Sequence, residues 1–145
     1  NEIVWMKRGP WVKQHDVDFV DETRIAIYNN NRFKRANGTE VVGGNNVMIY
    51  DFATDSVSAP LKDAFASHEV RTDSEGLFTM FPNGDVFAED SVAGRLIRIS
   101  NDGSKLWEYF NRGADGSLYR MNWSRVVPRG EGNRLAEVLS QTNCQ

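Results

Sequence analysis

The sequence has few of the residues that form cross-links, metal sites or membrane spans. It holds one cysteine, Cys144, and two histidines among 145 residues. A lone cysteine excludes an intramolecular disulfide and the paired-cysteine motifs of zinc and redox sites. No stretch approaches the roughly 18 consecutive apolar residues that a transmembrane helix needs. The first residues also lack the basic and then apolar segments of a signal peptide, so we expect none in this chain.

An excess of positive charge is also missing. The chain has 17 Lys and Arg against 20 Asp and Glu, which gives a net charge of −3 and a pI near 5.4. Phosphate backbones and anionic lipid surfaces attract basic proteins, so this balance argues against nucleic-acid and membrane partners. At this length, with 40% hydrophobic residues, we expect a single domain over residues 1–145.

Alternating apolar residues and turn signals predict an all-β fold for most of the chain. The Asn83-Gly84 pair is a strong hairpin signal between two of the expected strands. Apolar residues at Leu135, Val138 and Leu139 follow helical spacing, so a short C-terminal helix is expected over residues 134–139. We expect a loop at residues 37–46 and strands at residues 2–6, 15–20, 25–28, 47–52, 56–61, 69–71 with 77–81, 86–89, 95–99, 105–110 and 119–127.

Two stretches of the chain repeat each other. The tripeptide His-Asp-Val at 15–17 corresponds to His-Glu-Val at 68–70, an offset of 53, and residues 46–51 correspond to 94–99, an offset of 48. A repeat of about 50 residues with four short antiparallel strands is typical of a β-propeller blade. We therefore divide the chain into a leading outer strand (1–10), two blade-like repeats (11–66 and 67–112), the start of a third unit (113–130) and a C-terminal helix and tail (131–145). An antiparallel sandwich or meander would show the same alternation.

Two blades do not make a closed propeller, because propellers close with about four to eight blades. The sheets of such a partial β-propeller would leave apolar faces and strand edges exposed. These surfaces must be covered by the C-terminal segment or by another copy of the chain, and we expect a homo-oligomer.

The order of the motifs resembles that of the arylsulfotransferase-like β-propellers. The family has a Gln-His segment followed by a strand that ends in a Phe-Asp-Asn-Gly type turn, then a strand with a Val-x-Tyr pattern. It continues with a Pro-Asn-Gly turn, an Asp-Gly turn that leads to a Trp-Glu strand, and a Tyr-Arg start of another blade. The matching segments here lie between residues 11 and 128, at 11–17, 28–31, 46–51, 81–86, 102–108 and 119–125.

This resemblance implies an aryl-sulfate sulfotransferase that uses no nucleotide sulfate donor and no other cofactor. In such enzymes a histidine attacks the sulfuryl group of an aryl sulfate, releases a phenol and passes the group to a second phenol. His15 matches the family's nucleophilic histidine through the Gln14-His15 segment. The family's other histidines and an arginine, which bind sulfate oxygens, come from blades that would precede this segment. The resemblance also implies a periplasmic or secreted protein.

Four further residues are candidates for binding the substrate. His68 stands at the corresponding place in the second repeat and could bind an anion beside His15. Arg120 and Arg125 are spaced as residues at the ends of an inner strand, and Asn30 lies in the Asn-rich turn. Two histidines fall short of the three or four ligands that a metal site needs, so we expect no metal.

Three functions remain open from the sequence. The first is sulfuryl transfer through His15, in an active site that this chain alone does not complete. The second is a non-catalytic β-sheet module that self-associates and binds a small anionic or aromatic ligand. The third, a propeller hydrolase of the lactonase type, needs a metal ringed by carboxylates, which these residues do not assemble. The four tryptophans, including Trp107 and Trp123, are expected mainly in core packing.

Overall fold

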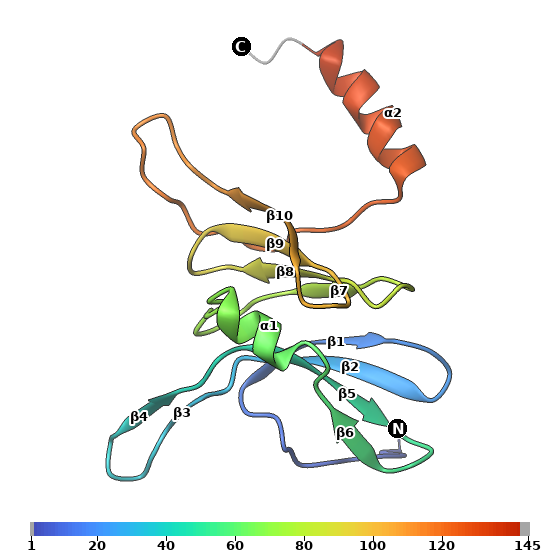
Figure 1. Cartoon of the computed structure of the whole chain (residues 1–145), viewed down its shortest axis with the longest axis vertical. Coiled ribbons are helices and arrows are strands. Elements are labelled where there is room, and N and C mark those ends of the chain that lie inside the picture. Colours follow the sequence, from blue (N-terminus) through green and yellow to red (C-terminus); the bar gives the residue numbers. More distant parts are fainter. Residues whose placement is uncertain (1, 143–145) are drawn as a thin grey trace.

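A computed structural model of the chain describes residues 2–142, which form two four-stranded antiparallel sheets and a C-terminal helix that stands away from them (Figure 1). The first sheet has the order β1 (Gln14–Phe19), β2 (Arg24–Asn29), β5 (Asn46–Asp51) and β6 (Ser56–Ser58). The second sheet runs through β7 (Phe78–Met80), β8 (Val86–Asp90), β9 (Arg95–Ile99) and β10 (Lys105–Phe110). The remaining elements are the hairpin β3 (Arg32–Lys34) and β4 (Glu40–Val42), α1 (Lys62–Ser67) and α2 (Arg129–Ser140). This is the all-β class with antiparallel four-stranded sheets that the sequence predicts.

Each sheet begins with a tight hairpin that follows the same backbone pattern. In the first, the Val20 amide donates to the Arg24 carbonyl at 2.9 Å, and in the second the Phe81 amide donates to the Asp85 carbonyl at 2.9 Å. Gly84 closes the second turn with a φ of +85°, a backbone conformation that glycine adopts without steric cost. The hairpin predicted at Asn83-Gly84 is thus confirmed.

The core lies between the two sheets, because alternate residues of each strand point to opposite faces. On β2, Ala26 and Tyr28 face the second sheet, whereas Ile25 and Ile27 belong to a separate cluster on the other face. The Tyr28 ring stacks on Phe78, with ring centroids 6.3 Å apart. Each large apolar side chain buried here contributes about 1.5–3 kcal/mol. The shared core comprises Ala26, Tyr28, Val47, Ile49, Leu61, Phe65, Val70, Phe78, Val86, Ala88, Ile97 and Ile99.

Extended segments without strands cover the two outer faces of this pair of sheets. On the first sheet, Trp5 packs on Tyr50 and Phe52, at centroid distances of 5.4 and 4.9 Å. On the second sheet, residues 119–128, here called the covering segment, lie over β8. Its Met121 amide donates to the Ser91 carbonyl at 3.2 Å.

Several expected elements are wrong. Residues 2–6 form no strand, and within the covering segment residues 119–127 form none either. The expected loop at 37–46 contains β4, which pairs with β3. Residues 59–61 and 69–71 lie outside strands, because α1 occupies the chain between them. Leu61 and Phe65, spaced four residues apart, are both buried in the shared core, which explains why this short segment is helical.

The predicted correspondence of His68 with His15 is also wrong. The two hairpins are superposed in sequence by their matching hydrogen bonds, in which Val20 corresponds to Phe81 and Arg24 corresponds to Asp85. Equivalent residues of the two first strands are therefore 61 positions apart. By this measure the residue equivalent to His15 is Gly76. His68 instead lies at the C-terminal end of α1, well before β7 begins.

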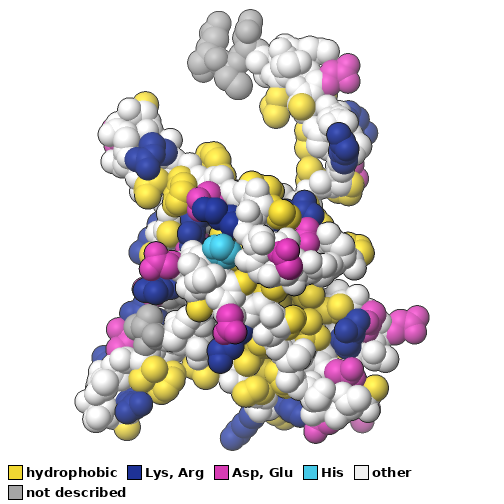
Figure 2. All heavy atoms as spheres, viewed as in Figure 1, with side chains coloured by type: hydrophobic (Ala, Val, Ile, Leu, Met, Phe, Trp, Pro, Cys, Tyr) yellow, Lys and Arg dark blue, Asp and Glu magenta, His cyan; other side chains and the backbone are white. Residues whose placement is uncertain are grey.

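The C-terminal helix is confirmed and is longer than predicted. Leu135, Val138 and Leu139 on α2 are exposed, and open space separates the helix from the sheets in the space-filling view (Figure 2). Within residues 2–142, neither helix is long and apolar enough to cross a membrane. Cys144 lies outside the described residues.

Candidate functional site

The most distinctive local feature is an irregularity of β1 at His15 and Asp16. The pairing of β1 with β2 shifts register between Gln14 and Val17. A bulge of this kind re-aims side chains that regular alternation would send to opposite faces. Here His15 Nδ1 lies 3.1 Å from the Gly76 carbonyl, and the Phe78 amide donates to Asp16 Oδ2 at 3.1 Å. Two consecutive side chains of the first sheet therefore bind the backbone where the second sheet begins.

The contact with Gly76 decides the tautomer of His15. A carbonyl oxygen can only accept a hydrogen bond, so Nδ1 must carry the proton. In the neutral ring Nε2 then holds the lone pair, which makes it the nucleophilic nitrogen and a hydrogen-bond acceptor. Position 76 requires glycine, because its φ is +89° and a Cβ there would lie 2.7 Å from the Tyr28 ring.

A small pocket of about 130 Å³ opens beside His15. Its walls come from β1, from residues 75–77 ahead of β7, from β8 and from the covering segment. Among the described residues that line it, two carry carboxylates and none is Lys or Arg. The pocket is lined by His15, Glu75, Gly76, Leu77, Glu89, Asn122 and Trp123.

The buried carboxylate of Glu89 ties these walls together. Glu89 is only 1% exposed, and each of its oxygens accepts one hydrogen bond. Ser91 Oγ donates to Oε1 at 2.7 Å, and the Ser124 amide donates to Oε2 at 2.7 Å. Ser91 Oγ in turn accepts the Gly76 amide at 3.0 Å. Glu89 thus connects the backbone at Ser124 directly, and the backbone at Gly76 through Ser91. These hydrogen bonds also satisfy the buried carboxylate.

The covering segment also places an aromatic side chain and a cation at the pocket. Trp123 is 70% exposed, and the Arg125 guanidinium lies 5.2 Å from the centre of its ring. The charge of Arg125 reaches Asp18 on β1. The pKa of the Asp18 carboxyl is raised, because burial disfavours the charged form and Asp16 adds negative charge, while Arg125 acts in the opposite direction.

None of the other predicted site residues lines this pocket, although the Arg125 guanidinium lies over the ring of Trp123, which does. His68 Nε2 is 2.9 Å from the Gly103 carbonyl, in the turn between β9 and β10. Asn30 is buried and donates to the carbonyls of Thr72 and Glu75, at 3.2 and 2.9 Å. The Arg120 carbonyl accepts the Asn111 side chain at 3.3 Å, and Arg120 is absent from the described pocket lining. Asn30 therefore orders the backbone next to the site.

Four residues that line the pocket were not among the site residues predicted from the sequence. They are Glu75, Glu89, Asn122 and Trp123. With its amide nitrogen turned toward Glu75, Asn122 donates to Glu75 Oε2 at 2.7 Å. The one available signal was Glu89, an acidic residue that directly follows the apolar run Val86-Phe87-Ala88. A charge at such a position is rarely buried unless it is hydrogen-bonded.

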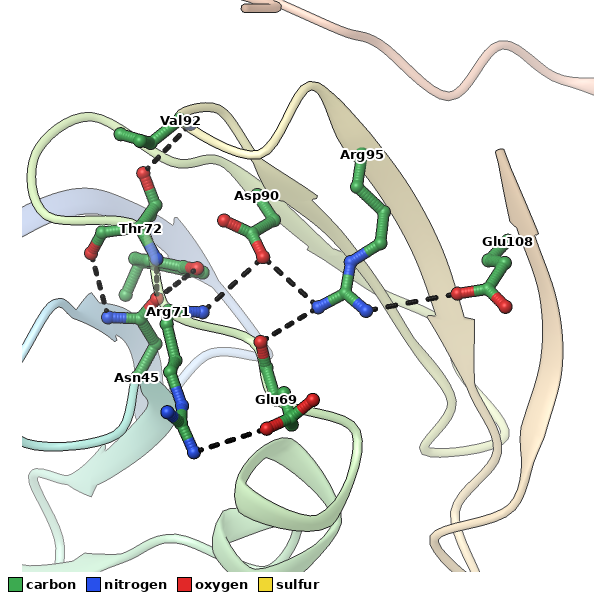
Figure 3. A network of polar contacts seen from close by, with 9 residues as sticks. Asn45, Glu69, Arg71, Thr72, Asp90, Val92, Arg95 and Glu108 are labelled. Carbon is green, nitrogen blue, oxygen red and sulfur yellow. Dashed lines mark hydrogen bonds and ion pairs between the residues drawn. The ribbon is translucent and has the colours of Figure 1, made fainter. Parts of the chain in front are cut away.

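A second polar network, on the far side of β8, has a structural role (Figure 3). Asp90 Oδ2 accepts the Arg95 guanidinium at 3.0 Å and the Arg71 amide at 3.4 Å. Arg95 also donates to the Glu69 carbonyl at 3.0 Å and lies 3.8 Å from Glu108. This network fixes the segment after α1 against the second sheet. Within residues 2–142, no group of three or more His, Cys, Asp and Glu residues could hold a metal ion.

Comparison with known proteins agrees with the predicted family resemblance. The family model described as arylsulfotransferase (ASST) matches residues 1–112, which include both sheets. No curated protein and no solved structure matches the chain. Because the matched region covers more than half of the sequence, the chain belongs to the arylsulfotransferase family.

Proposed function

We propose that this chain takes part in sulfuryl transfer from an aryl sulfate to a phenol, with His15 as the nucleophile. The observation that carries the proposal is the contact of His15 Nδ1 with the Gly76 carbonyl at 3.1 Å. This contact orients the ring and leaves the lone pair on Nε2 free to attack.

The reaction has two balanced steps. In the first, His15 Nε2 attacks the sulfur of the aryl sulfate, so that the N–S bond forms as the S–O bond breaks and the phenolate leaves with the electron pair. In the second, the oxygen of another phenol attacks the same sulfur. The N–S electron pair then returns to Nε2, and the acceptor phenol loses its proton.

The described pocket lacks the positive charge that an aryl sulfate requires. Its lining holds Glu75 and Glu89, and Arg125 is the cation placed at its edge. We therefore infer that cationic side chains from outside these two sheets complete the sulfate site. A second copy or further blades could supply them, because β1 exposes Val17 and Phe19, the latter by 89%. A single copy of the chain is therefore an incomplete enzyme, and transfer is expected only from an oligomer.

The alternative function is a self-associating β-sheet module without catalysis. One observation favours it. His15 and Asp16 each bind the backbone ahead of or within β7, so both could serve only to join the sheets. In that case His15 has no chemistry, and the exposed apolar side chains of β1 and β10 form contacts between copies.

A transfer assay distinguishes the two functions. We expect the protein to release para-nitrophenol from para-nitrophenyl sulfate when phenol is added, and the donor alone to add the mass of one SO₃ group to the protein. His15→Ala should abolish both signals, whereas His68→Ala, the matched histidine control, should keep them. Light scattering on the same sample identifies the active oligomer. Full transfer by His15→Ala, or no transfer by any oligomer, would contradict the proposal.

A further inference from the structure

The pocket beside His15 combines an exposed indole with acidic side chains, a pairing that the proposed reaction does not by itself explain. Trp123 is the large aromatic at its mouth, although the sequence predicts tryptophans mainly in the core. An exposed aromatic ring over a polar pocket is typical of a surface that stacks on a ligand ring.

The backbone holds Trp123 in this place at a conformational cost. Its φ is +65°, a left-handed conformation that bulky residues rarely adopt. The neighbours keep it there, because the Ser124 amide donates to the buried Glu89 at 2.7 Å and Asn122 binds Glu75. Strain of this kind clusters at ligand sites, where the surrounding structure enforces it.

The charge of the pocket indicates which aromatic ligand it accepts. The carboxylates of Glu75 and Glu89 line the cavity, and Asp16 and Asp18 lie close by on β1. Arg125 opposes this charge from beside Trp123, where its guanidinium lies next to the indole ring. The surplus of carboxylates repels anions and attracts cations, and it leaves a neutral phenol unaffected by net charge.

From these observations we propose that the pocket is the subsite for the acceptor phenol, that Trp123 stacks on its ring, and that the acidic lining selects phenols with a positively charged substituent. The assignment to the acceptor rests on the proposed function; the binding preference itself does not. In the second step the phenol oxygen forms the new O–S bond, the N–S pair returns to His15, and the hydroxyl proton passes to Glu75. A carboxylate has lone pairs left for this bond after it accepts Asn122.

A ligand series of matched size tests the proposal. Ligand-observed NMR titrations would compare para-ethylphenol, tyramine and para-hydroxyphenylacetate, which differ in charge at the same position. We expect tyramine to bind most tightly and the carboxylate most weakly. Trp123→Ala and Trp123→Gly should each weaken binding about tenfold or more. The glycine variant also relieves the backbone strain. If both variants bind more weakly, the weaker binding is therefore due to the missing indole ring and not to a changed backbone.

The controls separate the subsite from the chemistry. Trp5→Ala, which removes a tryptophan from the opposite end of the sheet pair, should leave binding unchanged. Glu75→Gln should reduce the preference for tyramine over para-hydroxyphenylacetate. His15→Ala should keep the order of affinities, because the order depends on Trp123 and the carboxylates. If the transfer assay fails while this order is observed, the proposed function is overturned and the binding preference is not. An unchanged affinity in both Trp123 variants, or tighter binding of the carboxylate, would overturn the subsite.

Discussion

The two sheets share one topology but differ at their first strands. In the first sheet β1 has six residues and a bulge at His15 and Asp16, whereas in the second sheet β7 has three residues and Gly76 stands where His15 would be. The bulge is what turns both side chains of β1 toward the second sheet. The strand that departs from regular pairing therefore supplies the two side chains that join the sheets, and the regular strand and the residues ahead of it supply the backbone partners.

A second difference lies at the ends of the central hairpins. In the first sheet Asn29 pairs with Asn46, and their side chains bind at 3.3 Å. At the same place in the second sheet Asp90 pairs with Arg95 at 3.0 Å. One topology thus accepts a neutral amide pair or an ion pair. The ion pair occurs in the second sheet because Arg95 also donates to the Glu69 carbonyl of a neighbouring segment.

The largest expected effect on stability comes from truncating a side chain in the core that the two sheets share. Phe65 of α1 is fully buried in the core between them. Phe65→Ala should lower the free energy of unfolding by about 4 kcal/mol, since it leaves a cavity that both sheets line. Urea denaturation followed by tryptophan fluorescence and circular dichroism measures this, with the exposed Phe52→Ala as the control. Two separate transitions in the wild-type protein would show that the sheets do not fold as one unit.

An intermediate effect should follow from exchanging the two polar pairs. Asp90→Asn leaves the largely buried Arg95 with the more distant Glu108, at 3.8 Å, as its remaining charge partner, at a cost of about 2 kcal/mol. The double variant with Arg95→Asn recreates the amide pair of the first sheet and should recover part of that loss. A double-mutant cycle from urea titrations measures the coupling. If the changes in unfolding free energy of the two single variants simply add up in the double variant, the two positions are not coupled, and the expected recovery is contradicted.

The smallest effect concerns acid stability at the hairpin turns. The pKa of Asp21 is lowered to about 2, first because the Arg24 side chain donates to it and then because the Thr23 amide does. The pKa of Asp85 is also lowered, by Asn83 and then by Arg98. A carboxyl group with a lowered pKa in the folded state stabilises the fold above its usual pKa, and this stabilisation is lost as the pH falls.

Asp21→Asn and Asp85→Asn should therefore each lower Tm slightly near neutral pH. For Asp21 the difference from wild type should shrink as the pH falls from 3.8 toward about 2. Thermal melts across this range provide the measurement, and Glu22→Gln in the same turn is the control. A difference that grows in acid would contradict the assigned direction.

Much of the fold could be predicted because its signals are local. The continuous apolar runs Val-Met-Ile-Tyr and Val-Phe-Ala predicted β5 and β8, and Asn83-Gly84 predicted the hairpin before β8. The repeat alignment was less accurate. Pairing through the hairpins makes Tyr50 equivalent to Ile99, one residue away from the predicted match. A slip of one residue in a strand exchanges its two faces, so the alignment by sequence similarity paired residues that point to opposite faces of their strands.

The missed features all depend on contacts between distant segments. α1 is too short to be stable alone and forms because Phe65 packs between the sheets. The pocket required residues 75–77, β8 and the covering segment to meet His15 across some 60 to 110 residues of chain.

The sequence by itself therefore determined the all-β class, most strands, the C-terminal helix and the family, because each depends on short-range patterns or motif order. Only the tertiary structure decided that His15 meets Gly76 and Trp123 while His68 binds Gly103 elsewhere. The physical reason is that His15, Asp16 and Glu89 contact backbone carbonyl and amide groups. Nearly every residue carries these groups, so the sequence does not show which residue will be the partner.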